Sequence, residues 1–301
     1  MTIIDEEFQA VREELGAYHE VGHTAAYSPI PDSEATTVNG YPIHPFVVAQ
    51  APDRANDPAG ELPADLYECF APEIFALVGI AGGVQREKIK RTKSDGTPVL
   101  DYTGPAPGDV VVAKFVHFWD YAKNIPSGRY LRYFAIDHPC SDLVARHART
   151  VSRDDHWKNL SNIRRPVKGE PRCWVEEIVV TNQLAGNPSS REQQDMLARF
   201  DNAMAVEMES IGIAREMHHL RKAVHYDPLW ICIRGISDVV YATSPSLPGG
   251  SDNAKQRDKW KLYASAIAAS FARAVIERIL EEARPGITGD AGVPPWGFPP
   301  K

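Results

Sequence analysis

The chain has 301 residues, of which 43% are hydrophobic and 24% are charged. This composition is typical of a soluble globular protein and excludes a fully disordered or fibrous chain. No apolar run reaches the roughly 18 residues that a transmembrane helix needs, so we expect no membrane partner. The 40 acidic residues outnumber the 33 basic residues and give a net charge of −7. We therefore expect no nucleic-acid partner, because sequence-independent binding requires neutralisation of phosphates.

The cysteines and histidines give no sign of a metal site. Cys69, Cys140, Cys173 and Cys232 are far apart in the chain, and no C-x-x-C or H-E-x-x-H motif occurs. Reduced cysteines are typical of a cytoplasmic protein. The first residues are acidic and lack the basic start and apolar core of a secretory signal, so we expect a cytoplasmic location.

The first third of the chain predicts few regular elements. Residues 2–4 read as a very short strand, and a helix capped by Asp5 follows to residue 16. Residues 17–40 are turn-rich, and the run from Phe46 to Ala49 predicts a strand. The prolines of residues 51–64 predict a loop.

The rest of the chain alternates between strands and helices. The strands are apolar runs without alternation, which a strand buried on both faces requires. We first predict a strand at 74–80 closed by a turn at Ala81-Gly82-Gly83, an exposed insertion at 85–107, a strand at 108–113 and a helix near 140–150. There follow a strand at 175–180, a helix at 191–200, an extended segment at 202–208 and a helix at 209–221. The last predicted elements are a strand at 229–238, a loop at 242–257 and a helix at 260–280.

This alternation predicts an α/β fold: a three-layer sandwich with a mixed, partly parallel central sheet flanked by helices. We expect one domain over residues 1–284, with insertions at about 85–107 and 124–172, and a Gly/Pro-rich tail at 285–301. In such sheets the ligand sits beyond the carboxyl ends of the strands. The candidate site therefore lies just after the apolar runs.

Three acidic residues, Glu7, Glu209 and Asp238, fall at strand ends or helix starts. A carboxylate at a helix N-terminus is stabilised by the helix dipole, so each position by itself has a purely structural explanation. Their joint occurrence is more informative than any one of them. Two of them, Glu209 and Asp238, stand in recognisable motifs.

Four motifs occur in a fixed order and are followed by a W-x2-Y-A-x2-I-A helix. They are G-I-A-G-G-V at 79–84, G-D-V-V-V-A at 108–113, A-V-E-M-E-S at 205–210 and I-R-G-I-S-D at 233–238. With these motifs the chain resembles the nucleoside phosphorylase/nucleosidase superfamily, and most of all 5′-methylthioadenosine/S-adenosylhomocysteine nucleosidases. It also resembles the nucleosidase-like domains of bacterial defence systems. The resemblance covers residues 2–16, 73–123 and 175–280 and implies cleavage of the N-glycosidic bond of a purine nucleoside or nucleotide.

The resemblance assigns roles to the three acids. Asp238 would hold or deliver a proton at purine N7, which makes the base a better leaving group. Glu209 would accept hydrogen bonds from the ribose hydroxyls. Glu7 falls where hydrolytic members carry the acid that activates water. This chemistry needs acids and positioning but no organic cofactor.

The same resemblance implies a set of substrate-binding residues. Ser237 and Arg234 would orient Asp238, Met208 would pack against the sugar, and an aromatic residue could stack on the ligand. The full set consists of Met208, Glu207, Ser237, Arg234, Ile80, Ala81, Gly82, Leu184, Thr181 and Trp119. Met208 and Trp119 are equally suited to ordinary core packing.

The chain departs from the family pattern at three places. Little precedes Asp5, and the glycine-containing phosphate loop expected there is absent. Ile80 stands where phosphorolytic members carry Ser or Thr, and isoleucine cannot donate a hydrogen bond to phosphate. The insertions are long, and Arg54, the basic residues of 86–93, Lys123 and Arg129 could bind the phosphates of a nucleotide.

Three functions remain open at this point. Hydrolysis is favoured by Ile80, and the alternatives are a phosphate-dependent purine nucleoside phosphorylase or a non-catalytic nucleotide-binding module on the same fold. The expected partner is a small-molecule purine nucleoside or nucleotide. The resemblance also implies a homo-oligomer, which in this family is a dimer, trimer or hexamer.

Overall fold

A computed structural model describes residues 1–22, 25–38, 41–96, 98–132, 142–183, 185–221, 226–242 and 253–283. In this part of the chain six strands form a mixed sheet in the order β11-β10-β7-β12-β5-β6. The strands are β5 (Ile74–Thr92), β6 (Pro98–Thr103), β7 (Val110–Phe118), β10 (Cys173–Val180), β11 (Ala203–Glu207) and β12 (Leu229–Tyr241). β10 runs parallel to β7 and β11, and β12 runs parallel to β5 and antiparallel to β7.

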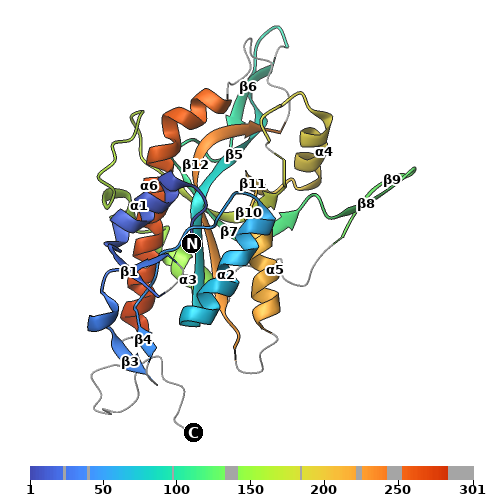
Figure 1. Cartoon of the computed structure of the whole chain (residues 1–301). Helices are drawn as coiled ribbons and strands as arrows, with labels where there is room; N and C mark the ends of the chain where they lie inside the picture. Colours follow the sequence, from blue (N-terminus) through green and yellow to red (C-terminus); the bar gives the residue numbers. More distant parts are fainter. Residues whose placement is uncertain are drawn as a thin grey trace.

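A further pairing joins β11 to β5 and closes the sheet on itself. Ala205 lies opposite Gly83, and Val206 lies opposite Gly82, in antiparallel register. The carboxyl end of β11 is thereby held next to the middle of β5. Beyond this point β5 continues into the antiparallel hairpin that it forms with β6 (Figure 1).

Helices cover both faces of the sheet, as the sequence predicted (Figure 1). One face packs against α6 (Asn253–Ala283), which also contacts α1 (Asp5–Leu15) and α3 (Asp142–Val151). The other face packs against α2 (Asn56–Phe70) and α5 (Ser210–Leu220). α4 (Arg191–Arg199) forms a smaller core with the ends of β10 and β11.

The continuous apolar run of β12 is explained by these two layers. Trp230 and Cys232 belong to the core shared with α2 and α5, whereas Ile231 and Ile233 belong to the core shared with α6. Successive side chains of a strand point to opposite faces, so both faces of β12 need apolar residues.

The remaining elements are short. They are β1 (His19–Val21) paired with β2 (Ala26–Ser28), β3 (Thr36–Val38) paired with β4 (Tyr41–Ile43), β8 (Ala122–Ile125) paired with β9 (Gly128–Leu131), and the 3₁₀ turns at Asp32–Glu34 and His156–Asn159. The predicted strand at 46–49 is reduced to a bridge between Val48 and Tyr27.

The predicted loop at 51–64 is wrong, because α2 begins at Asn56. Pro58 lies in the first turn of the helix, where backbone N–H groups have no partner within the helix in any case. Pro63 lies inside the helix and is buried together with Leu62 and Leu66. The buried apolar face therefore outweighs the hydrogen bond that Pro63 cannot make.

The predicted turn at Ala81-Gly82-Gly83 is also wrong, because β5 passes straight through it. A Cβ on Gly82 would lie 2.5 Å from Val240, and one on Gly83 would lie 2.6 Å from the Pro105 carbonyl oxygen. The glycines permit close packing here rather than a turn. Within the predicted insertion, Arg86–Thr92 of β5 and Pro98–Thr103 of β6 consequently pair as an antiparallel hairpin.

Several smaller boundaries also differ from expectation. β7 continues to Phe118 rather than ending at Ala113, and α6 starts at Asn253 inside the predicted 242–257 loop. α1 starts at Asp5, and the Glu7 carboxylate rather than Asp5 receives the N–H of Ile4. Cys140, Leu184 and the 285–301 tail lie outside the described residues.

Candidate active site

Buried charges gather at the carboxyl end of β11, the middle of β5 and β12, and the start of α1. Arg234 on β12 is fully buried, and Glu7, Glu207 and Glu209 act on it electrostatically. Burial by itself lowers the pKa of Arg234, but the carboxylates, Glu207 foremost, raise it overall. The arginine is therefore charged and balances an acidic cluster in the protein interior.

Glu7 is fixed by backbone donors from two segments. Its Oε2 accepts hydrogen bonds from the N–H groups of Ile3 at 2.9 Å and Ile4 at 3.1 Å, and its Oε1 accepts one from Ile80 at 2.7 Å. Burial raises the pKa of Glu7, while Arg234 and the three N–H donors oppose that shift. Glu7 thus connects α1 to the strand that carries the G-I-A-G-G motif.

Gly79 provides the space in which Glu7 and Arg234 meet. A Cβ on Gly79 would collide with the Arg234 guanidinium and would lie 2.5 Å from Glu7 Oε1. Any side chain at this position would have to displace one of these groups. The first glycine of the motif is therefore required by the charged cluster.

Glu207 is engaged on both carboxylate oxygens. Oε1 accepts hydrogen bonds from the Ser210 hydroxyl at 2.6 Å and the Ser210 N–H at 3.1 Å. Oε2 receives the Glu209 N–H at 3.0 Å and the guanidinium of Arg234. Glu207, predicted to bind substrate, caps α5 and holds Arg234 in the described structure.

Glu209 stands at the N-cap position of α5, and its Oε2 lies 3.2 Å from Arg234 Nη2. Burial raises the pKa of Glu209 to about 8, with Arg234 opposing and Glu207 adding to the shift. The neighbouring Met208 is half-buried. At neutral pH the protonated form of Glu209 therefore predominates.

Asp238 lies on β12 beside Gly82 of β5. The register between the two strands shifts between Ile236 and Asp238, so that Ser237 forms a bulge. The Ser237 hydroxyl donates to Asp238 Oδ1 at 2.6 Å. Burial raises the pKa of Asp238, and the bond from Ser237 and the charge of Arg257 oppose that shift. A carboxyl in these surroundings is suited to carrying a proton.

The two acidic positions are separated along β5. Glu7 contacts the strand at Ile80, whereas Asp238 pairs with Gly82. Ile80 is half-buried and Ala81 is buried between them. The charged cluster therefore lies beside β5 at Ile80, and the single acid Asp238 lies beside the same strand two residues further along, at Gly82.

Thr181 belongs to a polar network that runs beside this cluster. Its hydroxyl donates to Asp120 Oδ2 at 3.1 Å, and the next residue, Asn182, accepts a hydrogen bond from Asn56 Nδ2 at 2.7 Å. Asn56 Oδ1 in turn accepts the N–H of Gly212 in the first turn of α5 at 3.1 Å. Neither Asn56 nor Asp120 carried a signal in the sequence, because single polar residues outside a motif are common.

Trp119 lies apart from the charged cluster. It is buried with Phe200 of the α4 core, its ring is covered by the guanidinium of Arg129 at 4.1 Å, and its indole N–H donates to Glu192. The core-packing interpretation of Trp119 agrees with these contacts. Leu184, the other predicted wall of the base, lies outside the described residues.

The basic residues suggested for phosphate binding do not converge. Arg86 donates to the carbonyl oxygens of Phe200 and Asp201, and Arg129 donates to the carbonyl oxygen of Trp119. Residues 86–92 belong to the β5–β6 hairpin, while Lys123 belongs to the separate β8–β9 hairpin (Figure 1). A single phosphate site made of all these residues is therefore not present in the described structure.

The described residues show no sign of a metal centre or of a membrane-spanning helix. In these residues no cluster of three or more His, Cys, Asp or Glu side chains is arranged to hold a metal ion. None of their helices combines the length and apolarity needed to span a membrane. Cys69, Cys173 and Cys232 are free thiols.

Solved structures share this architecture along most of the chain. Futalosine hydrolase of Helicobacter pylori superposes with a TM-score of 0.60 at 15% identity, over 92% of this chain and 95% of its own. The 5′-methylthioadenosine/S-adenosylhomocysteine nucleosidase of Colwellia psychrerythraea, in complex with adenine, gives 0.58 at 16% identity, over 92% and 93%. The nucleosidase of that specificity from Neisseria meningitidis, in complex with methylthio-immucillin-A, gives 0.56 at 18% identity, over 92% and 97%.

These similarities concern the fold. The chain has the fold of the nucleoside phosphorylase/nucleosidase superfamily, as its motifs led us to expect. No family of known proteins and no curated protein matches its sequence.

Proposed function

We propose that this protein hydrolyses the N-glycosidic bond of a purine nucleoside or nucleotide and releases the free base and the ribosyl moiety. The observation that carries the proposal is the separation of two acidic positions along β5. Glu7 and Glu209 flank Arg234 at one position, and Asp238 faces Gly82 at the other. A reaction that develops charge on both the sugar and the base needs acids at two such places.

Asp238 serves the base in this mechanism. Its raised pKa favours the protonated form, which donates a proton to N7 of the purine. The bond between C1′ and N9 then breaks, and its electron pair leaves with the base. Ser237 orients the carboxyl through its hydrogen bond to Oδ1.

Glu209 and Glu7 serve the sugar and the water. Glu209 accepts hydrogen bonds from the ribose hydroxyls while Arg234 fixes its position. Glu7 takes a proton from the water that attacks C1′, and the N–H groups of Ile4 and Ile80 hold the carboxylate in place. Met208, at the edge of the cluster, packs against the sugar.

Water rather than phosphate is the favoured nucleophile. Ile80 has no side-chain donor, and its backbone N–H is occupied by Glu7. Free thiols at Cys69, Cys173 and Cys232 support a cytoplasmic location for the enzyme.

Chromatographic detection of free base tests the proposal. The substrates are adenosine, guanosine, inosine, methylthioadenosine and the purine mono- and triphosphates, each with and without inorganic phosphate. We expect base release without phosphate and a loss of about 10²–10⁴-fold for Asp238→Asn, the usual range for an acid catalyst. Release only with phosphate, no release from any substrate, or full activity of Asp238→Asn would each contradict it.

A further inference from the structure

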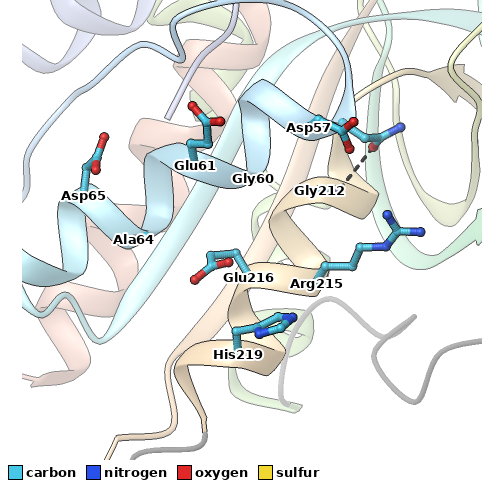
Figure 2. Close-up of a pocket in the computed structure, with 10 residues that line it drawn as sticks. Asp57, Gly60, Glu61, Ala64, Asp65, Gly212, Arg215, Glu216 and His219 are labelled. Atoms are coloured by element: carbon cyan, nitrogen blue, oxygen red, sulfur yellow. Dashed lines mark hydrogen bonds between the residues drawn. The ribbon is translucent and has the colours of Figure 1, made fainter.

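Arg54 lies in a short loop whose two ends are both held in place. Before it, Gln50 Nε2 donates to Asp5 Oδ1 at 2.9 Å and so ties the chain to the start of α1. After it, Asn56 Oδ1 accepts the N–H of Gly212 at 3.1 Å, the bond drawn as a dashed line between α2 and α5 in Figure 2. The loop therefore holds Arg54 beside the start of α1.

The backbone directly after Arg54 is strained. Ala55 has a φ of 77°, which residues other than glycine rarely adopt. Such a conformation persists only where the surrounding structure holds it, and it is found preferentially at ligand-binding and active sites. Here Asn56, which is 2% exposed and donates to Asn182 Oδ1 at 2.7 Å, supplies the restraint. The strain agrees with a loop that is shaped for a ligand.

The positive charge of Arg54 is not neutralised by a neighbouring acid. The residue is exposed, and within the described part of the chain its guanidinium forms no ion pair. Asp53 accepts the backbone N–H of Arg54 at 2.7 Å. Glu6 of α1 is bound by Lys261 of α6 at 2.6 Å. This bond lowers the pKa of Glu6 most, and the charge of Arg54 lowers it further, so Arg54 lies near Glu6 while Lys261 is the direct partner.

A second arginine, Arg257 of α6, lies beside Asp238. The first turn of α6 is bound to β12 at the residue after this acid, because Gln256 Oε1 accepts the Val239 N–H at 2.9 Å. Asn253 Nδ2 donates to the carbonyl oxygen of Val239, also at 2.9 Å. Arg257 follows directly on α6, is half-buried, and acts electrostatically on Asp238. No carboxylate among the described residues forms an ion pair with Arg257.

Lys261 connects the two arginines, and we call Arg54, Lys261 and Arg257 the basic rim. Lys261 lies four residues after Arg257 on α6, where like charges repel. Its hydrogen bond to Glu6 raises the pKa of Lys261 most, and the charge of Arg257 opposes that shift. Glu6 therefore neutralises Lys261, whereas the two arginines keep their charge. An anion placed between them would supply the missing counter-charge.

The stereochemistry of a nucleoside brings its 5′ carbon to the side of Arg257. In a β-nucleoside the base and C5′ project from one face of the ribose ring, and the 2′ and 3′ hydroxyls project from the other. In the proposed mechanism Asp238 serves the base and Glu209 binds the hydroxyls. C5′ is therefore on the same side of the sugar as Asp238, where Arg257 lies.

We propose that the basic rim binds the 5′-phosphate of the substrate, so that the protein acts on purine nucleotides in preference to nucleosides. This inference rests on the proposed hydrolysis, since the position of the sugar follows from it. Arg54 and Arg257 each present a planar fork of N–H donors that matches phosphate oxygens. Their two charges balance the charge of about −2 on a monophosphate. Lys261 holds Glu6 and so prevents this carboxylate from competing for the arginines.

Base release from matched pairs of substrates tests the inference. The pairs are adenosine, guanosine and inosine, each with its 5′-monophosphate, and the measured quantity is kcat/KM. We expect wild type to prefer the nucleotide of the favoured base by about tenfold or more. Arg54→Leu and Arg257→Leu should each lower the nucleotide-to-nucleoside ratio by about tenfold, and Arg257→Lys should keep part of the preference. Arg153→Leu removes an exposed arginine elsewhere and should leave the ratio unchanged.

Titration calorimetry with the same six compounds separates this inference from the hydrolysis. Asp238→Asn protein, in which turnover is blocked, should bind the nucleotide more tightly than the nucleoside, and adding Arg54→Leu should remove the difference. If no base is released at all, the proposed hydrolysis fails and this binding difference alone decides whether the rim holds phosphate. Base release or binding that is equal for nucleotide and nucleoside would overturn the inference and leave hydrolysis standing. Equal losses on both substrates in Arg257→Leu would mean that Arg257 serves Asp238 alone and would remove it from the rim.

Discussion

Arg234 and Glu207 form an ion pair whose side chains are 0% and 1% exposed. Glu207 also holds the N-terminus of α5 through Ser210, so the pair fixes β12, β11 and α5 relative to one another. Glu209 approaches the same guanidinium from the start of α5. The charge of Arg234 is thus a structural requirement of the fold as well as a feature of the site.

Arg234→Met should destabilise the protein severely. It leaves the buried carboxylate of Glu207 without its counter-charge, and removing one partner of a buried pair costs about 3–5 kcal/mol. The free energy of unfolding, measured in urea, reports this loss. Arg191→Met is the matched control, because its pair with Asp195 is exposed and should contribute little. Equal stability of the two variants would contradict the assigned role.

Gly79→Ala should damage both stability and activity. The added methyl group collides with Glu7 and Arg234, and overpacking of this kind costs about 1–3 kcal/mol. Displacement of Glu7 should lower base release by about a hundredfold. Gly186→Ala is the control, because its Cβ would lie 3.9 Å from Asn253 in ordinary contact. Unfolding curves and the chromatographic assay measure the two effects, and a fully active Gly79→Ala would count against the geometry.

The raised pKa of Glu209 predicts a defined pH dependence of stability. Its ordinary value is 4.5 and its value in the folded protein is about 8, so the folded state binds the extra proton between these limits. The stability from this group is present below pH 4.5 and is lost as pH rises toward about 8. The free energy of unfolding of wild type relative to Glu209→Gln should therefore fall across this range. Denaturant titrations at several pH values measure it, and a flat or rising difference would disprove the shift.

The hydrogen bond between Asn56 and Asn182 predicts a charge coupling. Asn182→Asp keeps an acceptor for Asn56 Nδ2, and Asn56→Asp keeps an acceptor for the N–H of Gly212 and can receive the amide of Asn182. Each single variant should be tolerated, whereas the double variant places two carboxylates face to face. A double-mutant cycle on the free energy of unfolding should give a coupling of about 1 kcal/mol. Additive effects would show that the two side chains act independently.

The correctly predicted elements are strands that are buried on both faces of the sheet and helices that bury one apolar stripe. The β12 run and the α6 stripe leave few alternatives, because Trp230 and Ile231 must face different layers and Phe271 must face the sheet. α2 was missed because Pro63 is a strong local signal against a helix. Only the position of α2 against α5 and the sheet shows that Leu62 and Leu66 are buried.

Glu209 and Asp238 could be singled out because they stand in motifs, whereas Glu7 lies in none of the four motifs and the contacts of each acid could not be predicted. Only the family resemblance separates Glu207 from Glu209 in the sequence, and the positions of Ser210 and Arg234 show that Glu207 is fully engaged. The network through Asn56 joins segments far apart in the chain. Such contacts depend on the tertiary fold, which no local pattern contains.

The pairing of β11 with β5 has a consequence for how the protein reaches its native state. It joins Ala205 to Gly83 across a long stretch of chain. The neighbouring charged cluster combines Glu7 from α1 with Arg234 from β12, the last strand of the described residues. Contacts of such high sequence separation slow folding, because the entropy of closing the long loops is lost before the contacts form. During synthesis the charged cluster assembles only after β12 has emerged. Until then Glu7 has no buried counter-charge from Arg234.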